Sequence, residues 1–132
     1  HKITVMSFIK EMKSYSNITF LKSRDSISDQ IQILSTFTIG WIPYDLKVPF
    51  NYYCNPTKFY EYCALGIPVI STELPVLKDH SKFIHFIKDK NDFASSVQEI
   101  LRTQEVSFKS KNFAKKQNID EKYKMIRGYL KS

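Results

Sequence analysis

The segment from residue 55 to residue 72 limits the possible folds most, because it combines a helix start, a helix stop and a strand. Asn55 is a favourable N-cap residue, and Pro56 suits the first helical position. Gly66, followed closely by a proline, is typical of a helix end. The run Val69–Thr72 then has the length of a short buried strand. We therefore expect a helix that leads directly into a strand.

The rest of the chain repeats this alternation. The strand candidates are Ile3–Met6 (which also fits a helix start), Asn17–Lys22, Phe37–Ile42, Val69–Thr72 and Ile84–Ile87. Helices are expected around residues 27–34, with Ser26 as the cap, and at 55–65, 91–101, 108–116 and 118–130. Strands that alternate with helices favour an α/β fold with a parallel sheet covered by helices on both faces. The length favours one domain spanning residues 1–132.

Composition excludes several classes of protein. Of the 132 residues, 42% are hydrophobic and 14% are aromatic, which argues against disorder. No apolar run approaches the ~20 residues of a membrane-spanning helix. Two cysteines, Cys54 and Cys63, are too few for a disulfide scaffold and lack the spacing of a metal site. We expect no metal, no cofactor and a reduced, cytoplasmic setting, with Cys63 as a core residue.

The net charge of +7 is concentrated near the end of the sequence. Residues 102–132 hold 9 of the 20 basic residues and 3 of the 13 acidic ones, which leaves 11 basic and 10 acidic residues before them. Such a basic tail suggests an anionic surface, either membrane or nucleic acid. A solvated helix face is the plainer alternative.

Lys58 and Glu61 are the leading candidates for a binding site, since residues three apart share one helix face. The helix start offers free backbone N–H groups from Thr57 and Lys58 and a positive dipole end, which suit a phosphate. Glu61, one turn deeper, suits the vicinal diol of a ribose. Together they match the geometry of a bound nucleotide diphosphate. The alternative is a surface ion pair worth a few tenths of a kcal/mol.

Further candidates follow the predicted strands, where parallel sheets bind ligands. The segment Pro43–Cys54 has no clear period, and loops of this length are often functional. Ser71 and Thr72 could touch phosphate or sugar, although ordinary strand-end hydroxyls are an equal alternative. Arg24 could approach a nucleobase edge.

Three aromatic or histidine residues are interpreted as structural. His80 and His85 flank a predicted strand without a partner at catalytic spacing, so we expect packed or solvated histidines. Trp41 is expected in the core rather than as a platform for a sugar. No catalytic residue is assigned.

The stretch PTKFYEYCALGIPV, residues 56–69, closely resembles the P-x-K-x-x-E-Y-x-A-x-G-x-P-V signature of GT-B glycosyltransferases that use nucleotide-sugar donors. The flanking segments NITFLKS, FTIGWIPY, FIKDKNDFASSVQEIL and NFAKKQNIDEKYKMI are similar to the family's neighbouring elements. The resemblance implies a truncated Rossmann-like domain, the C-terminal, donor-binding half of an enzyme that transfers sugar to a glycan or a lipid-linked acceptor.

The resemblance also implies roles for single residues. Glu61 would hold the ribose hydroxyls, and Lys58 with Thr57 at the helix start would face the donor's phosphates. Asn55 and Tyr53 are counted with the donor-binding residues, next to the loop toward which the donor's sugar would point. Many relatives have a second Glu eight residues before the ribose Glu, where this chain has Tyr53.

The resemblance further implies which partners to expect. The family's first strand–loop–helix unit and its N-terminal acceptor domain are not found in the sequence, so we expect an inactive piece with weak nucleotide affinity. The partners that the resemblance implies are the nucleotide-sugar donor and the N-terminal domain. The charge of the basic tail adds an anionic membrane surface as an expected partner, and nucleic acid is not expected. Two alternatives stay open: a basic α/β domain that binds nucleic acid or regulates, and a sugar-nucleotide epimerase with the GT-B fold.

Overall fold

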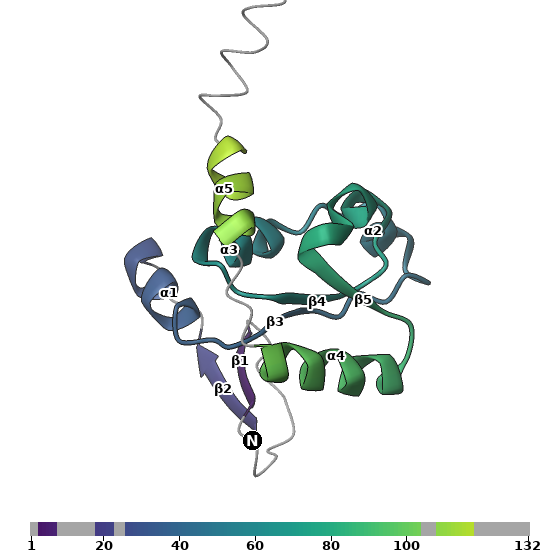
Figure 1. Ribbon diagram of the computed structural model, residues 1–132, viewed down its shortest axis with the longest axis horizontal. Coiled ribbons are helices and arrows are strands. Elements are labelled where there is room, and N and C mark those ends of the chain that lie inside the picture. The colour runs from purple at the N-terminus through teal and green to yellow at the C-terminus, as the bar shows by residue number, and fades with distance from the viewer. Residues whose placement is uncertain (1–2, 8–17, 23–25, 104–107, 118–132) are drawn as a thin grey trace, which may run out of the picture. The chain divides into compact units, whose positions relative to one another are not determined.

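A computed structural model of the chain describes residues 3–7, 18–22, 26–103 and 108–117 (Figure 1). The chain divides into two compact units, His1–Thr36 and Phe37–Ser132. Each unit contains a parallel sheet and at least one helix. The expected α/β class with parallel strands is therefore confirmed.

The first unit holds two strands and a helix. Strands β1 (Ile3–Ser7) and β2 (Ile18–Lys22) pair in parallel, so the strand interpretation of the first segment is confirmed. Helix α1 (Ile27–Leu34) begins after Ser26, whose side chain accepts a hydrogen bond from the Asp29 backbone N–H at 3.5 Å. This is the N-cap that the sequence predicts.

The second unit holds a three-stranded parallel sheet in the order β3 (Gly40–Ile42), β4 (Val69–Thr72), β5 (Ile84–Ile87). Strands β4 and β5 have the predicted bounds. The prediction of a strand over Phe37–Ile42 is wrong in length, since only the last three residues pair with β4. Pro68 lies directly before β4 and has no N–H to donate, so the hydrogen bonds between β3 and β4 cannot continue past it.

Helices cover both faces of this sheet (Figure 1). Helix α3 (Thr57–Leu65) connects β3 to β4 and packs on one face. Helix α4 (Lys90–Thr103) covers the other face, where Ile100 packs with Ile70 and Ile87. The connections also contain α2 (Pro49–Tyr52) and the 3-10 segment η1 (Pro75–Phe83).

Helix α3 ends where the sequence predicts. Gly66 adopts a left-handed φ of 74°, and the Ile67 N–H donates to the Tyr62 carbonyl at 2.9 Å. This bond pattern satisfies carbonyl groups that the helix end leaves without partners.

Helix α5 (Phe108–Lys116) packs against the end of α3. The Ser110 hydroxyl donates to the Cys63 carbonyl at 3.4 Å, and the side chain of Lys111 lies over Gly66. The helix predicted at 118–130 lies outside the described residues. Within the described part of the chain, no helix has the length and apolar character needed to span a bilayer.

Candidate functional site

The start of α3 lies on the side of the sheet where β3 ends. The prediction that Asn55 caps this helix is wrong: Pro56 is the N-cap residue, with an extended backbone, and Asn55 is exposed one residue before it. Pro56 has a ψ of 114°, so helical backbone begins only at Thr57 and the cap position falls on Pro56 instead of Asn55. No side chain of the described residues caps this end. The backbone N–H groups of Thr57 and Lys58 are therefore at the helix start, where they have no acceptor within the helix.

Lys58 and Glu61 come together on one face of α3, as predicted. The Lys58 ammonium donates to a Glu61 carboxylate oxygen at 2.5 Å, and both side chains are more than one-third exposed. This is the ion pair that the plainer interpretation expects. An exposed pair at this spacing stabilises a helix by only a few tenths of a kcal/mol. Another charged partner can therefore displace it at little cost.

Tyr62, next to Glu61, anchors α3 to the sheet. Its side chain is buried, and this burial is the main reason why the pKa of its hydroxyl is raised. The negative charge of Glu61 raises this pKa further. Its ring lies so close to Gly40 of β3 that an added Cβ there would be 2.4 Å from the Tyr62 Cδ2 atom. Gly40 thus allows α3 to approach the strand. The sequence signal for this contact was a glycine inside a strand, which often marks a close approach.

The strand-end hydroxyls of β4 bond to the protein backbone. The buried Ser71 hydroxyl donates to the Ile42 carbonyl at 3.3 Å, and the Thr72 hydroxyl donates to the Tyr44 carbonyl at 2.8 Å. Both bonds connect β4 to the end of β3 and the loop that follows it. The structure therefore supplies these hydroxyls with the partners expected of ordinary strand-end residues.

The loop from β3 to α3 is organised by local hydrogen bonds. The Asp45 carboxylate accepts from the Lys47 backbone N–H at 2.9 Å, and the Asn51 side chain donates to the Asp45 carbonyl at 3.1 Å. The loop exposes three rings: Phe50 is 79% exposed, Tyr53 is 82% exposed and Tyr52 is 43% exposed. Tyr53 is thus accessible next to the helix start. Phe50 is not among the residues that the sequence predicts for the site, because nothing in its spacing distinguishes it from other loop residues.

The remaining candidates are distributed elsewhere. Arg24 lies outside the described residues. Trp41 is 46% exposed and packs on Phe93 of α4 at 5.0 Å between ring centroids, so the expectation that it belongs to the core is wrong. Phe93 thus covers part of the Trp41 side chain and leaves nearly half of it exposed.

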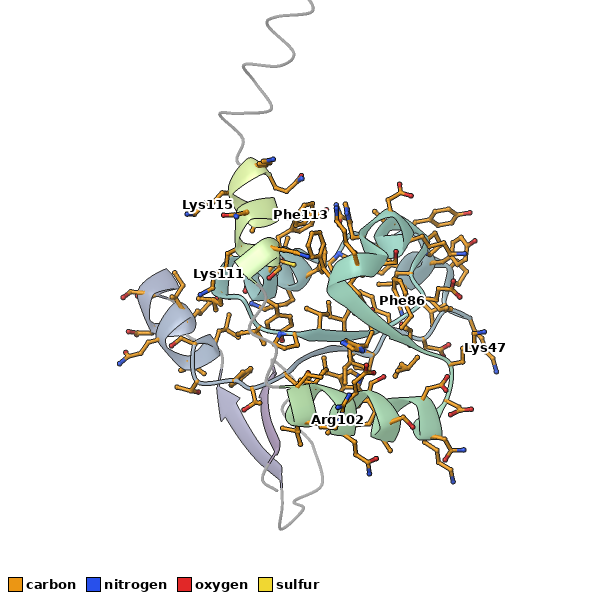
Figure 2. The ribbon with its side chains drawn as sticks, viewed as in Figure 1. Lys47, Phe86, Arg102, Lys111, Phe113 and Lys115 are labelled. Carbon is orange, nitrogen blue, oxygen red and sulfur yellow. The ribbon has the colours of Figure 1, made fainter. Side chains whose placement is uncertain are left out.

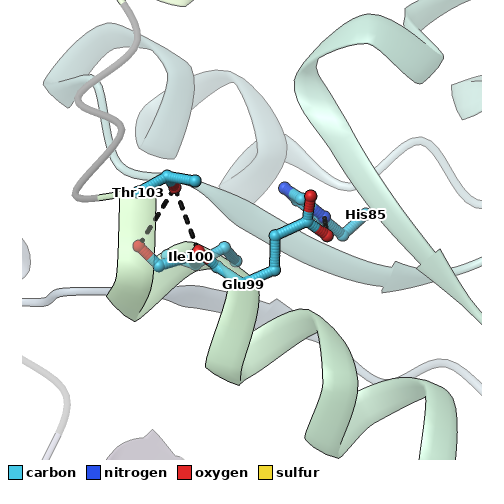
Figure 3. A network of polar contacts seen from close by, with 4 residues as sticks. All are labelled: His85, Glu99, Ile100 and Thr103. Atoms are coloured by element: carbon cyan, nitrogen blue, oxygen red, sulfur yellow. Dashed lines mark hydrogen bonds and ion pairs between the residues drawn. The ribbon is translucent and has the colours of Figure 1, made fainter.

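The histidines have structural surroundings, as expected. His80 packs among rings, 5.4 Å from Phe59 and 4.9 Å from Phe113 between centroids. His85 lies 3.8 Å from the Glu99 carboxylate of α4, beside the turn where the Thr103 hydroxyl donates to backbone carbonyls (Figure 3).

The two cysteines are free. Cys63 is buried, as predicted, and burial raises the pKa of its thiol to about 12. Cys54 lies beside Tyr44, whose pKa is raised by burial and then by a hydrogen bond with Cys54. Among the described residues, no group of three or more His, Cys, Asp or Glu could hold a metal ion.

Comparisons with protein-family models, with curated proteins and with solved structures gave no significant match. The functional interpretation therefore depends on the residues of this chain and on their arrangement.

Proposed function

We propose that this chain is the donor-binding part of a glycosyltransferase that uses a nucleotide-diphosphate sugar. The observation that carries the proposal is the arrangement at the start of α3. There, Lys58 in the first turn and Glu61 three residues further along share one partly exposed face, and no described side chain caps the helix start. In this proposal, phosphate binds the Lys58 ammonium and the first N–H groups of α3, and ribose binds the Glu61 carboxylate.

The energetics favour an exchange of partners. The Lys58–Glu61 pair contributes a few tenths of a kcal/mol, whereas charge-assisted hydrogen bonds contribute roughly 1.5–3 kcal/mol each. A ligand with phosphate next to a diol offers each side chain a new partner. A phosphate alone would attract Lys58 and repel Glu61, so this pair selects a ligand that carries both groups.

The other parts of the proposal come from the resemblance of residues 56–69 to the GT-B signature. They are a truncated GT-B donor domain, a sugar acceptor of the glycan or lipid-linked class, and an N-terminal domain that binds it. A cytoplasmic setting belongs to the same proposal and agrees with two free cysteines.

Nucleotide titration followed by NMR tests the proposal on the 132-residue chain. Uridine and guanosine diphosphate are added in turn, with uridine and inorganic phosphate as partial ligands. We expect the largest amide shifts at Thr57, Lys58 and Glu61 with one of the diphosphates, and weak affinity. Glu61→Ala should reduce the nucleotide affinity at least tenfold, the loss of about one charge-assisted bond. Glu61→Gln should lose less, because its amide keeps one acceptor oxygen.

Glu73→Ala is the matched control, because Glu73 forms a comparable exposed ion pair with Lys78 at 3.7 Å. This variant should bind nucleotide as the parent chain does. Equal losses in Glu61→Ala and Glu73→Ala, or diphosphate shifts that spare the start of α3, would refute the proposal.

A further inference from the structure

Helix α5 is basic on its solvent side. It carries four lysines and no acidic residue, and Lys109, Lys115 and Lys116 are exposed. Among the described residues, no carboxylate forms an ion pair with any of these three. Their positive charge is therefore not neutralised by the described part of the protein.

The side of α5 that carries Ser110 is held against the rest of the second unit, and the partly exposed Phe113 lies at its edge. Ser110 is buried and donates to the carbonyl of Cys63 in α3. Phe113 packs on Phe59 of α3 at 5.9 Å between ring centroids. These contacts fix the rotation of the helix about its axis. Lys109 and Lys116 stand four and three residues from Phe113 and share its side of α5. Lys115, two residues from Phe113, is on another side of the helix, and the two are labelled on opposite sides of α5 in Figure 2.

The end of η1 extends this surface with rings and another cation. Phe83 stacks on Phe113 at 4.8 Å between centroids, and the Lys82 ammonium lies 5.1 Å from the centroid of the Phe83 ring. Both rings are partly exposed, and Lys82 is exposed. We call this combination of three lysines and two rings the η1–α5 surface: Lys82, Lys109, Lys116, Phe83 and Phe113.

We infer that the η1–α5 surface docks on an anionic lipid bilayer. Lysines on flexible stems beside aromatic rings are typical of surfaces that lie at the boundary of a membrane. All three cations are lysines, which act as point charges and lack the planar fork with which arginine reads phosphates and bases. This favours the diffuse charge of a bilayer surface over a nucleic acid. The inference is independent of nucleotide binding, because none of these residues belongs to the start of α3.

Cosedimentation of the 132-residue chain with lipid vesicles tests the inference. The probes are vesicles of phosphatidylcholine alone and of phosphatidylcholine with phosphatidylserine. We expect binding only to the mixed vesicles, weakened by added salt, which screens exposed charges. Each lysine near an anionic bilayer strengthens binding by about fivefold, so Lys82→Gln, Lys109→Gln and Lys116→Gln combined should weaken it about a hundredfold.

The control removes three charges from α4 and the turn before it. Lys88→Gln, Lys90→Gln and Arg102→Gln combined change the net charge equally, and Arg102 projects from α4, away from the labelled residues of α5 (Figure 2). This variant should keep binding within about threefold, because distant charges are screened. Arginine at positions 82, 109 and 116 should preserve binding, which separates a charge effect from a folding defect. Equal losses in both glutamine variants, absence of vesicle binding, or tight binding to mixed-sequence DNA without vesicle binding would overturn the inference.

Discussion

Replacement of Gly40 by alanine tests how closely α3 must pack against the sheet. The added Cβ would lie 2.4 Å from Cδ2 and 2.6 Å from Cε2 of Tyr62, about 1 Å inside ordinary contact distance. Gly66, and not Gly40, has a positive φ among the described residues. Gly40→Ala therefore introduces a steric clash with the ring and no strain of a left-handed backbone.

The structure sets the size of the expected effect. The ring of Tyr62 is buried, so it cannot move into solvent, and overpacking of this kind typically costs 1–3 kcal/mol. Alanine recovers about 0.4–1 kcal/mol by restricting the unfolded chain. We expect Gly40→Ala to lower the free energy of unfolding by about 1–2 kcal/mol. For a unit of this size, that corresponds to a fall in Tm of roughly 4–16 °C.

Urea unfolding followed by circular dichroism measures the loss, and a double-mutant cycle identifies its cause. In the Tyr62→Ala background the ring is absent, so Gly40→Ala should be neutral or slightly stabilising. The same loss in both backgrounds would show that Tyr62 is not what excludes a Cβ at position 40. Stabilisation by the single substitution would also refute the argument.

Two further predictions concern the end of α3. Gly66→Ala should lower the free energy of unfolding by about 1–2 kcal/mol because its φ of 74° is left-handed, and Lys111→Ala should not restore it, since the flexible Lys111 stem can move aside. The Cys63 thiol should resist iodoacetamide in the folded chain at pH 8, whereas Cys54 reacts. Folding raises the pKa of the Cys63 thiol from 9.0 to about 12, so the stability that the protonated thiol contributes should be lost as the pH rises from about 9 to about 12. Rapid Cys63 labelling in the folded chain, or full rescue by Lys111→Ala, would contradict these expectations.

Local signals were sufficient for much of the fold. The Gly66 helix stop, the Ser26 cap and strands β4 and β5 follow from residue types that act through their own backbone. Elements that depend on a partner were less predictable. Strand β3 is shorter than its apolar run because Pro68, on the neighbouring strand side, cannot continue the ladder.

For the site too, contacts within one helix were predictable and contacts between distant segments were not. Helical spacing placed Lys58 and Glu61 on one face, and the structure confirms their proximity. Spacing cannot show that Ser71 and Thr72 bond to carbonyls of β3 and its loop, because those acceptors are about 28 residues away in sequence. The exposure of Trp41 also depends on how it packs against Phe93 of α4, and the residues next to Trp41 in the sequence do not show this contact.

The contacts of α3 are divided unevenly along its length. Its later residues are buried against β3 and α5, through Tyr62 and Cys63, and its end is fixed by the left-handed Gly66. Its first turn has only a partly exposed ion pair and no described side-chain cap. Substitutions at Gly40 or Gly66 should therefore change stability first, whereas substitutions at Lys58 or Glu61 should change ligand binding with little effect on unfolding. This division suits a binding site, because packing at the later residues holds the helix in place. The polar groups of its first turn then contribute little to the fold and stay available to a ligand.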